Sequence, residues 1–89
     1  MIRLEWSSHF EKSLKKWVSK HPESRDVIRQ KLEQFSIDPM APELKNHKLS
    51  GKLNGLRAIS AGYDCRIVYS FVDENTALLV AIGTHDEVY

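Results

Sequence analysis

The first half of the chain shows two different repeats of apolar residues. Between residues 2 and 6, apolar and polar side chains alternate, which is the period of a short, half-buried strand. Over residues 8–20 and again over residues 22–37, apolar side chains recur at helical spacing. Pro22 divides the two stretches, because proline suits the first turn of a helix and not its interior. The pattern therefore predicts one strand and then two helices that form an antiparallel hairpin.

The second half is punctuated by glycines and rich in β-branched and aromatic residues. Residues 56–60 and 65–72 have the composition of strands. Residues 73–75 predict a hairpin turn, and residues 76–82 are apolar enough for a strand covered on both faces. We expect an α+β fold in the order β-α-α-β-β-β, with the helical hairpin on one face of a four-stranded, mainly antiparallel sheet whose last three strands form a meander. The other face of the sheet is expected to be free.

Length and composition restrict the possible classes of protein. The 89 residues predict a single domain, residues 1–89. The longest apolar run, residues 77–82, has six residues, whereas a membrane span needs roughly 18. The single cysteine, Cys65, cannot form an internal disulfide, so we expect a cytoplasmic protein in a reducing environment. These features argue against a membrane protein and against a disulfide-stabilised scaffold.

Charge is unevenly distributed, although the net charge is only +1. Residues 1–52 carry 11 Lys and Arg against 7 Asp and Glu, a balance of +4, and residues 53–89 carry 2 against 5, a balance of −3. Lysines at helical spacing and in the following loop make up the candidate binding residues for a polyanion: Lys12, Lys16, Lys20, Lys48 and Lys52. Such clusters suit phosphate groups, but they are also common on solvated helix faces.

The sequence carries no metal or cofactor signature. The four histidines share no ligand spacing with each other or with Cys65, and no phosphate-binding glycine loop is present. Cys65 itself lies in a strand pattern, where we expect it to pack as a small apolar residue. Polar residues with possible chemistry are spread over the second half: His47, Arg57, Asp64, Arg66, His85 and Tyr89. Arg57 and Arg66 fall on neighbouring predicted strands and could meet on one face, around an anion or in an ion pair with Asp64.

Several short segments of the second half together resemble the RelE/ParE toxin superfamily, and within it the RelE/YafQ-type mRNA interferases of type II toxin–antitoxin modules. They are His47-x-Leu49-x-Gly51, Gly55-x-Arg57, Gly62-Tyr63, Arg66-Ile67-Val68-Tyr69 and Gly83-Thr84-His85-Asp86-Glu87-Val88-Tyr89. The order of predicted strands and helices is similar as well. The resemblance covers essentially the whole chain, and the last of these segments is its most specific part.

The resemblance implies an endoribonuclease that cuts mRNA in the ribosomal A site and needs no metal or other cofactor. In this chemistry the ribose 2′-hydroxyl attacks the adjacent phosphate. The reaction requires a base, positive charge for the developing phosphorane and an acid for the leaving oxygen. Histidine suits the proton transfers because its ordinary pKa lies near 6.5, and arginine can donate two hydrogen bonds to a phosphate.

The family's roles can be assigned to individual residues of this chain. Arg66 matches the arginine placed against the scissile phosphate, and Arg57 matches a basic residue on the preceding strand. His47, Asp64 and His85 match catalytic positions of the YafQ branch. Tyr89 matches an aromatic residue that acts in catalysis or base stacking. We expect His47 and His85 to share the acid–base work, and Arg66 and Arg57 to hold the phosphate. We expect Asp64 to orient a histidine or arginine, and the lysines to bind ribosomal RNA.

Three positions depart from the family pattern and predict weaker activity. Ser60 stands where YafQ-type enzymes have a second histidine, Cys65 where they have a tryptophan, and Ala81 near a further arginine. Other readings therefore stay open: a ParE-like toxin directed at gyrase, a decayed toxin that only binds its antitoxin, and a general binder of single-stranded RNA that stacks bases on Tyr63, Tyr69 or Phe71. The toxin readings imply a cognate antitoxin in a hetero-oligomer, and the nuclease reading adds the ribosome and mRNA.

Overall fold

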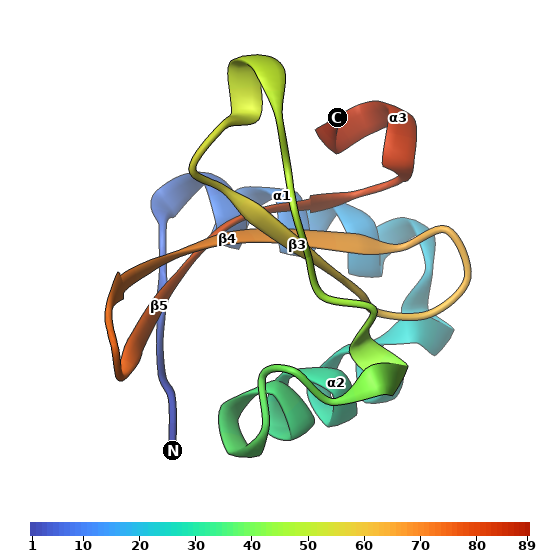
Figure 1. Cartoon of the computed structure of the whole chain (residues 1–89). Helices are drawn as coiled ribbons and strands as arrows, with labels where there is room; N and C mark the ends of the chain where they lie inside the picture. The colour runs from blue at the N-terminus through green and yellow to red at the C-terminus, as the bar shows by residue number, and fades with distance from the viewer.

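A computed structural model describes the whole chain, residues 1–89. Strands and helices combine in an α+β arrangement (Figure 1). The strands are β1 (Arg3–Trp6), β2 (His47–Lys48), β3 (Arg57–Ser60), β4 (Arg66–Asp73) and β5 (Thr76–Gly83). The α-helices are α1 (Ser8–Lys20), α2 (Arg25–Ile37) and α3 (His85–Val88), and short 3₁₀ helices are η1 (Pro22–Ser24), η2 (Pro42–Leu44) and η3 (Gly51–Leu53). None of the helices combines the length and the apolar character that crossing a lipid bilayer requires.

The sheet has five strands in the order β1-β5-β4-β3-β2. The last three strands pair antiparallel as expected, but β1 pairs parallel to β5, and β2 adds a strand beside β3. The expectation of a four-stranded sheet was therefore wrong, and His47, which falls outside the predicted strands, begins β2. A two-residue strand is too short to show an alternating pattern, and the direction of β1 depends on the path of the two intervening helices.

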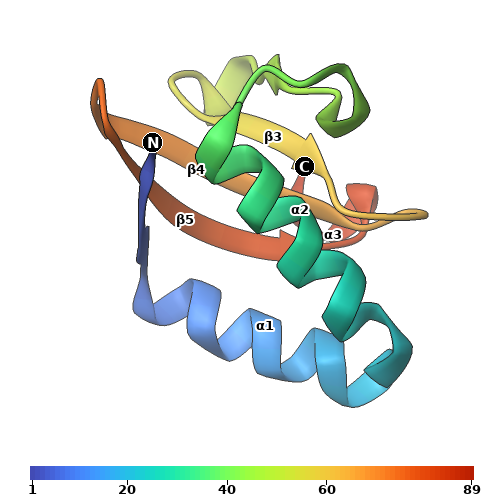
Figure 2. The same ribbon diagram turned by 90° about the horizontal axis from the view of Figure 1, so that it is seen from below.

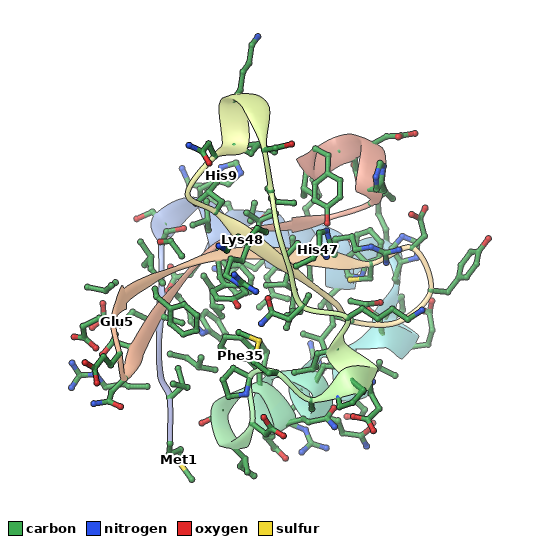
Figure 3. The ribbon with its side chains drawn as sticks, viewed as in Figure 1. Met1, Glu5, His9, Phe35, His47 and Lys48 are labelled. Carbon is green, nitrogen blue, oxygen red and sulfur yellow. The ribbon has the colours of Figure 1, made fainter.

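Helices α1 and α2 run in opposite directions but meet only at η1 and diverge from there (Figure 2). The expected close hairpin is thus an open one. Apolar side chains from both helices reach the sheet. The ring of Phe35 on α2 lies 4.7 Å from the ring of Tyr69, and both residues are fully buried. Figure 3 shows Phe35 between α2 and the strands.

A third helix, α3, follows β5 directly, where the sequence pattern gave no helix. It is held by a capping box, in which Thr84 Oγ1 accepts from the backbone N–H of Glu87 and the Glu87 carboxylate accepts from the backbone N–H of Thr84. The sheet separates α2 from α3 and η3, which lie on its other side (Figure 1). On that side Ala58 and Val68 are buried, so this face is partly covered and not free as expected.

Candidate functional site

The contact between β2 and α3 brings two histidines around one tyrosine. The Tyr89 hydroxyl lies 3.2 Å from Nε2 of His47. The Tyr89 and His85 rings meet edge to face, with their centroids 4.4 Å apart. In Figure 3, His47 lies below α3 in this view. All three residues are exposed, so a polynucleotide could reach them from solvent. We call His47, His85 and Tyr89 the aromatic cluster.

Asp64 connects the turn before β4 to the start of α3. Its Oδ1 accepts a hydrogen bond from the backbone N–H of His85 at 3.4 Å. Asp64 has a φ of 51°, a left-handed conformation in which asparagine and aspartate are enriched among residues with a side chain. The carboxylate thus contacts the main chain of His85, while the His85 ring nitrogen Nδ1 lies 3.4 Å from Oδ1 of Asp86. The expectation that Asp64 orients a histidine remains a prediction about function.

Arg66 begins β4 on the same face of the sheet as His47. Arg66 pairs with Ser60 and His47 pairs with Ala58, and residues 58 and 60 share one face of β3. Nη1 of Arg66 donates to the Cys65 carbonyl at 3.1 Å and to Ser60 Oγ at 3.5 Å. No carboxylate pairs with Arg66, so of the two alternatives left open by the sequence, the ion pair with Asp64 is absent.

The charge of Arg66 also reaches Tyr89. Burial raises the pKa of the Tyr89 hydroxyl above its ordinary value of 10.0, and the positive charge of Arg66 opposes this shift only in part. The hydroxyl therefore stays protonated at neutral pH and can donate a hydrogen bond. Arg66 and the aromatic cluster together form a site with one guanidinium, two imidazoles and a phenol.

Arg57 does not join this site. It pairs with Tyr69 across the β3–β4 ladder, on the face that packs against α2. Its Nε donates to Oδ1 of Asn46 at 2.9 Å. Because Arg57 and Ser60 are three residues apart on one strand, Arg57 and Arg66 point to opposite faces. The expectation that the two arginines meet on one face was wrong.

The three departures from the family pattern have different surroundings. Ser60 touches Arg66, as described above. Cys65 is buried in the core, where desolvation raises the pKa of its thiol from 9.0 to about 12. Cys65 is thus a packing residue and not a nucleophile, as expected. Ala81 pairs with Val68 and lies at the edge of a hollow that contains the helical lysines.

The candidate lysines form two separate groups. Lys12, Lys16 and Lys20 line a hollow of about 700 Å³ between α1 and α3. The Glu87 carboxylate also lines it, and its pKa is lowered mainly by the hydrogen bond from the Thr84 backbone and further by Lys20 and Lys16. Lys52 lies in η3 and does not line this hollow, and Lys48 shares the face of Arg57. The structure does not bring the five lysines together.

A larger, apolar hollow of about 1030 Å³ lies where α1 and α2 diverge. We call it the helix groove. Its apolar wall comes from β1 and both helices: Met1, Leu4, Trp6, Leu14, Val18, Ile28, Leu32 and Ile37. Trp6 is 48% exposed and Ile37 is 71% exposed. Three cationic side chains and one carboxylate also line it: Lys15, Arg25, Arg29 and Glu33.

Two features of the site were missed in the sequence. The first is α3, although Thr84 and Glu87 have the spacing of a capping box, which could have revealed the helix. The second is Asn46, which contacts three other residues and has no sequence signal of its own.

Comparisons with known proteins identify the family and the fold. Residues 2–89 match the profile of the family described as "Bacterial toxin of type II toxin-antitoxin system, YafQ". A metal-bound toxin from Helicobacter pylori is 32% identical, with a TM-score of 0.81 and full coverage of both chains. YafQ from Escherichia coli is 20% identical, with a TM-score of 0.79 over 100% of this chain and 99% of that one. The E. coli DinJ-YafQ complex gives 20% identity, a TM-score of 0.75 and the same coverage. No curated protein sequence matches the chain significantly.

The metal in the H. pylori toxin raises the question of whether this chain could hold one. A protein metal site normally needs at least three nitrogen, oxygen or sulfur ligands from side chains. Nowhere in the chain do three His, Cys, Asp or Glu side chains come together in this way. The residues present do not fit a metal centre.

Proposed function

Because the chain belongs to the YafQ family of bacterial type II toxins, we propose that it is a ribosome-dependent mRNA endonuclease that acts in the cytoplasm. The observation that supports this most directly is the arrangement of the aromatic cluster beside Arg66. Two groups that can transfer protons and one guanidinium lie on the same exposed face. Cleavage of RNA by its own 2′-hydroxyl needs these functions and no others.

In the proposed reaction the 2′-hydroxyl oxygen attacks the adjacent phosphorus, and one imidazole takes the hydroxyl proton. The bond from phosphorus to the 5′ oxygen breaks, and the other imidazole, in its protonated form, gives a proton to that oxygen. The products are a 2′,3′-cyclic phosphate and a free 5′-hydroxyl. Arg66 stabilises the charge that develops on the non-bridging oxygens, because a guanidinium can donate two parallel hydrogen bonds. Tyr89 stacks on a base or holds His47 in place.

Ribosomal RNA is the proposed ligand of the lysine-lined hollow between α1 and α3. Contacts between lysines and phosphates supply most of the affinity of such interfaces and depend strongly on salt. Lys12, Lys16 and Lys20 lie on the α1 side of α3, and the aromatic cluster lies towards β2. A ribosome-bound toxin could thus hold RNA at one side of α3 and the mRNA at the other.

A protein antitoxin is the proposed partner. Structures of DinJ bound to YafQ support a partner of this kind. The helix groove is its proposed docking site, because the groove is largely apolar and carries three cations against one carboxylate. Its occupant should be an amphipathic helix with an apolar stripe and acidic flanks, which pairs with Lys15, Arg25 and Arg29.

Primer extension on ribosome-bound mRNA tests the proposed activity. The wild type should cut the message, and Arg66→Ala and His85→Ala should lose most of the cutting. Arg3→Ala is a matched control, since Arg3 is exposed and pairs with Thr76, at the far end of β5 from Gly83, the partner of Arg66. Equal cutting by all four proteins would refute the site. No cutting by the wild type, with antitoxin binding intact, would favour a decayed toxin that only binds its antitoxin.

A further inference from the structure

Both ring nitrogens of His47 have a fixed neighbour. Nδ1 lies 3.0 Å from the backbone carbonyl oxygen of Lys45, and Nε2 lies 3.2 Å from the hydroxyl oxygen of Tyr89. A carbonyl oxygen can only accept a hydrogen bond, so Nδ1 must carry the hydrogen. In the neutral ring Nε2 then has the free electron pair, and Tyr89 donates to it.

We propose that Asn46, acting with the main chain of Lys45, is a positioning residue that selects this tautomer of His47. The carbonyl of Lys45 determines which nitrogen carries the hydrogen, and the side chain of Asn46 keeps that carbonyl in place. This proposal deepens the proposed function. The choice of tautomer does not depend on that function, and only the catalytic consequence of the tautomer rests on it. The consequence is that Nε2, on the side of α3, is the atom of His47 that exchanges a proton with substrate, once the substrate has displaced the Tyr89 hydroxyl from it.

The conformation of Lys45 explains how its carbonyl reaches the ring. Lys45 has φ 51° and ψ 42°, which is the left-handed helical region. In this conformation the chain turns sharply, so the carbonyl of residue 45 lies against the side chain of residue 47. A residue with a Cβ atom is disfavoured in this region, so other contacts must hold it there.

Asn46 supplies those contacts through both ends of its amide. Its Nδ2 donates to the Tyr69 hydroxyl at 2.6 Å and to the Pro39 carbonyl at 2.9 Å. Its Oδ1 accepts from Nε of Arg57 at 2.9 Å. Tyr69 is fully buried against Phe35, so the amide is anchored to the core. The network links the core to the residue directly before His47.

The same network gives Arg57 a role on the far face of the sheet. Its guanidinium Nε occupies the acceptor side of Asn46, which fixes the orientation of the amide. Because Oδ1 of Asn46 accepts from Arg57, Nδ2 of Asn46 must face the Tyr69 hydroxyl and the Pro39 carbonyl. Both of those oxygen atoms can accept a hydrogen bond. Arg57 therefore acts on the site through Asn46 and does not contact the phosphate.

The tautomer can be measured directly in the purified chain, without RNA, by long-range ¹H–¹⁵N NMR of the His47 ring at a pH where it is neutral. In the wild type Nε2 should resonate as an unprotonated nitrogen and Nδ1 as a protonated one. In Asn46→Ala and Asn46→Asp the two resonances should move towards each other, because the Nε2–H form becomes populated. A wild type in which Nε2 carries the hydrogen would overturn the proposal without any variant.

Three further variants give one additional test of the network and two controls. Tyr69→Phe removes one hydroxyl and keeps the ring in the core, so it tests the network if Asn46→Ala does not fold; it should shift the tautomer in the same direction. Lys45→Gly keeps the carbonyl and accepts a positive φ, so it should leave the tautomer unchanged. Asn54→Ala should also change nothing, since Asn54 is exposed and outside the network. A folded Asn46→Ala with the wild-type tautomer would contradict the proposal.

Cleavage assays separate this proposal from the proposed function. If the chain is a nuclease, Asn46→Ala should lower turnover by on the order of 10-fold, because a misplaced reacting group slows the reaction, and should leave ribosome affinity unchanged. If the tautomer shifts as expected but the wild type cuts no RNA, the nuclease activity is refuted and the positioning role stands. If the wild type cuts RNA and the tautomer is independent of Asn46, the positioning role is refuted and the nuclease activity stands.

Discussion

The hydroxyl of Tyr89 lies 3.2 Å from Nε2 of His47, and this contact joins residues that are 42 positions apart in the chain. It ties α3 to β2, neither of which the residue pattern predicts. The phenol is protonated at neutral pH, and it donates this hydrogen bond when the hydrogen of the His47 ring is on Nδ1, as proposed above. This hydrogen bond joins His47 to the rest of the aromatic cluster. Deleting the hydroxyl oxygen of Tyr89 removes the bond.

Replacing Tyr89 with phenylalanine should weaken cleavage more than stability. The ring contact with His85 is retained, whereas the hydrogen bond to His47 is lost. We expect turnover to fall roughly 10-fold and the free energy of unfolding to change by less than about 1 kcal/mol, because the bond is exposed. Primer extension and urea denaturation measure the two quantities. Tyr63→Phe is the control, since Tyr63 is 100% exposed, and an equal loss there would contradict the prediction.

The two arginines should behave in opposite ways. Arg57→Ala removes the donor to Oδ1 of Asn46 and should lower the free energy of unfolding by about 1–2 kcal/mol. Arg66→Ala should cost less stability and abolish most cleavage, because Arg66 faces the proposed substrate. Urea denaturation and primer extension on both variants check this. A stable Arg57→Ala that cuts no RNA would show that Arg57 contacts substrate instead.

The thiol of Cys65 should be inert in the folded protein. Its pKa of about 12 leaves almost no thiolate at pH 8, so alkylation by iodoacetamide should occur only after unfolding. The unfolded chain, with an ordinary thiol pKa of 9.0, loses its proton first as the pH rises. Cys65 should therefore stabilise the fold less and less between pH 9 and pH 12.

Cys65→Ala supplies the control for this pH dependence. It removes the thiol, so its free energy of unfolding should fall less steeply between pH 9 and pH 12 than that of the wild type. Denaturation at several pH values in this range gives the two slopes. Rapid alkylation of the native protein at pH 8, or identical slopes, would show that the thiol is not desolvated.

The lysines of α1 should determine how ribosome binding depends on salt. Changing Lys12, Lys16 and Lys20 together to alanine should weaken binding and reduce its slope against salt concentration, because fewer counterions are released from RNA. Filter binding or sedimentation at several salt concentrations measures this slope. Lys15→Ala is the matched control, because Lys15 lies on the same helix but lines the helix groove. An unchanged slope in the triple variant would place ribosomal RNA elsewhere.

Antitoxin binding should be sensitive to charge in the helix groove. Ile37→Glu introduces a carboxylate at a 71% exposed apolar position of the groove and should lower the affinity for the antitoxin at least 10-fold, while folding is unaffected. Val72→Glu is the control, since Val72 is 59% exposed and lies outside the groove. Calorimetric titration with the purified antitoxin gives both affinities. Equal affinities for the two variants would move the docking site away from the groove.

Much of the fold could be predicted because each of its main helices and strands is longer than one period of its apolar pattern. Helices α1 and α2 and strands β4 and β5 each cover several periods, so their apolar faces are visible in the residues alone. The resemblance to YafQ-type toxins was confirmed by the family match over residues 2–89. Strand β2 and helix α3 span two and four residues, and such short elements are stabilised by neighbours rather than by their own pattern.

The candidate site shows the same division. The sequence alone determined which residue types are available, namely His47, Arg66, His85 and Tyr89. Only the tertiary structure decided that Arg57 leaves this group, because the register of β3 against β4 assigns each side chain to a face. Only the tertiary structure placed Asn46 between Arg57, Tyr69 and Pro39. The periodicity of a helix or strand depends on residues that are neighbours in the sequence. Strand register and long-range hydrogen bonds depend on segments that meet only after the chain has folded.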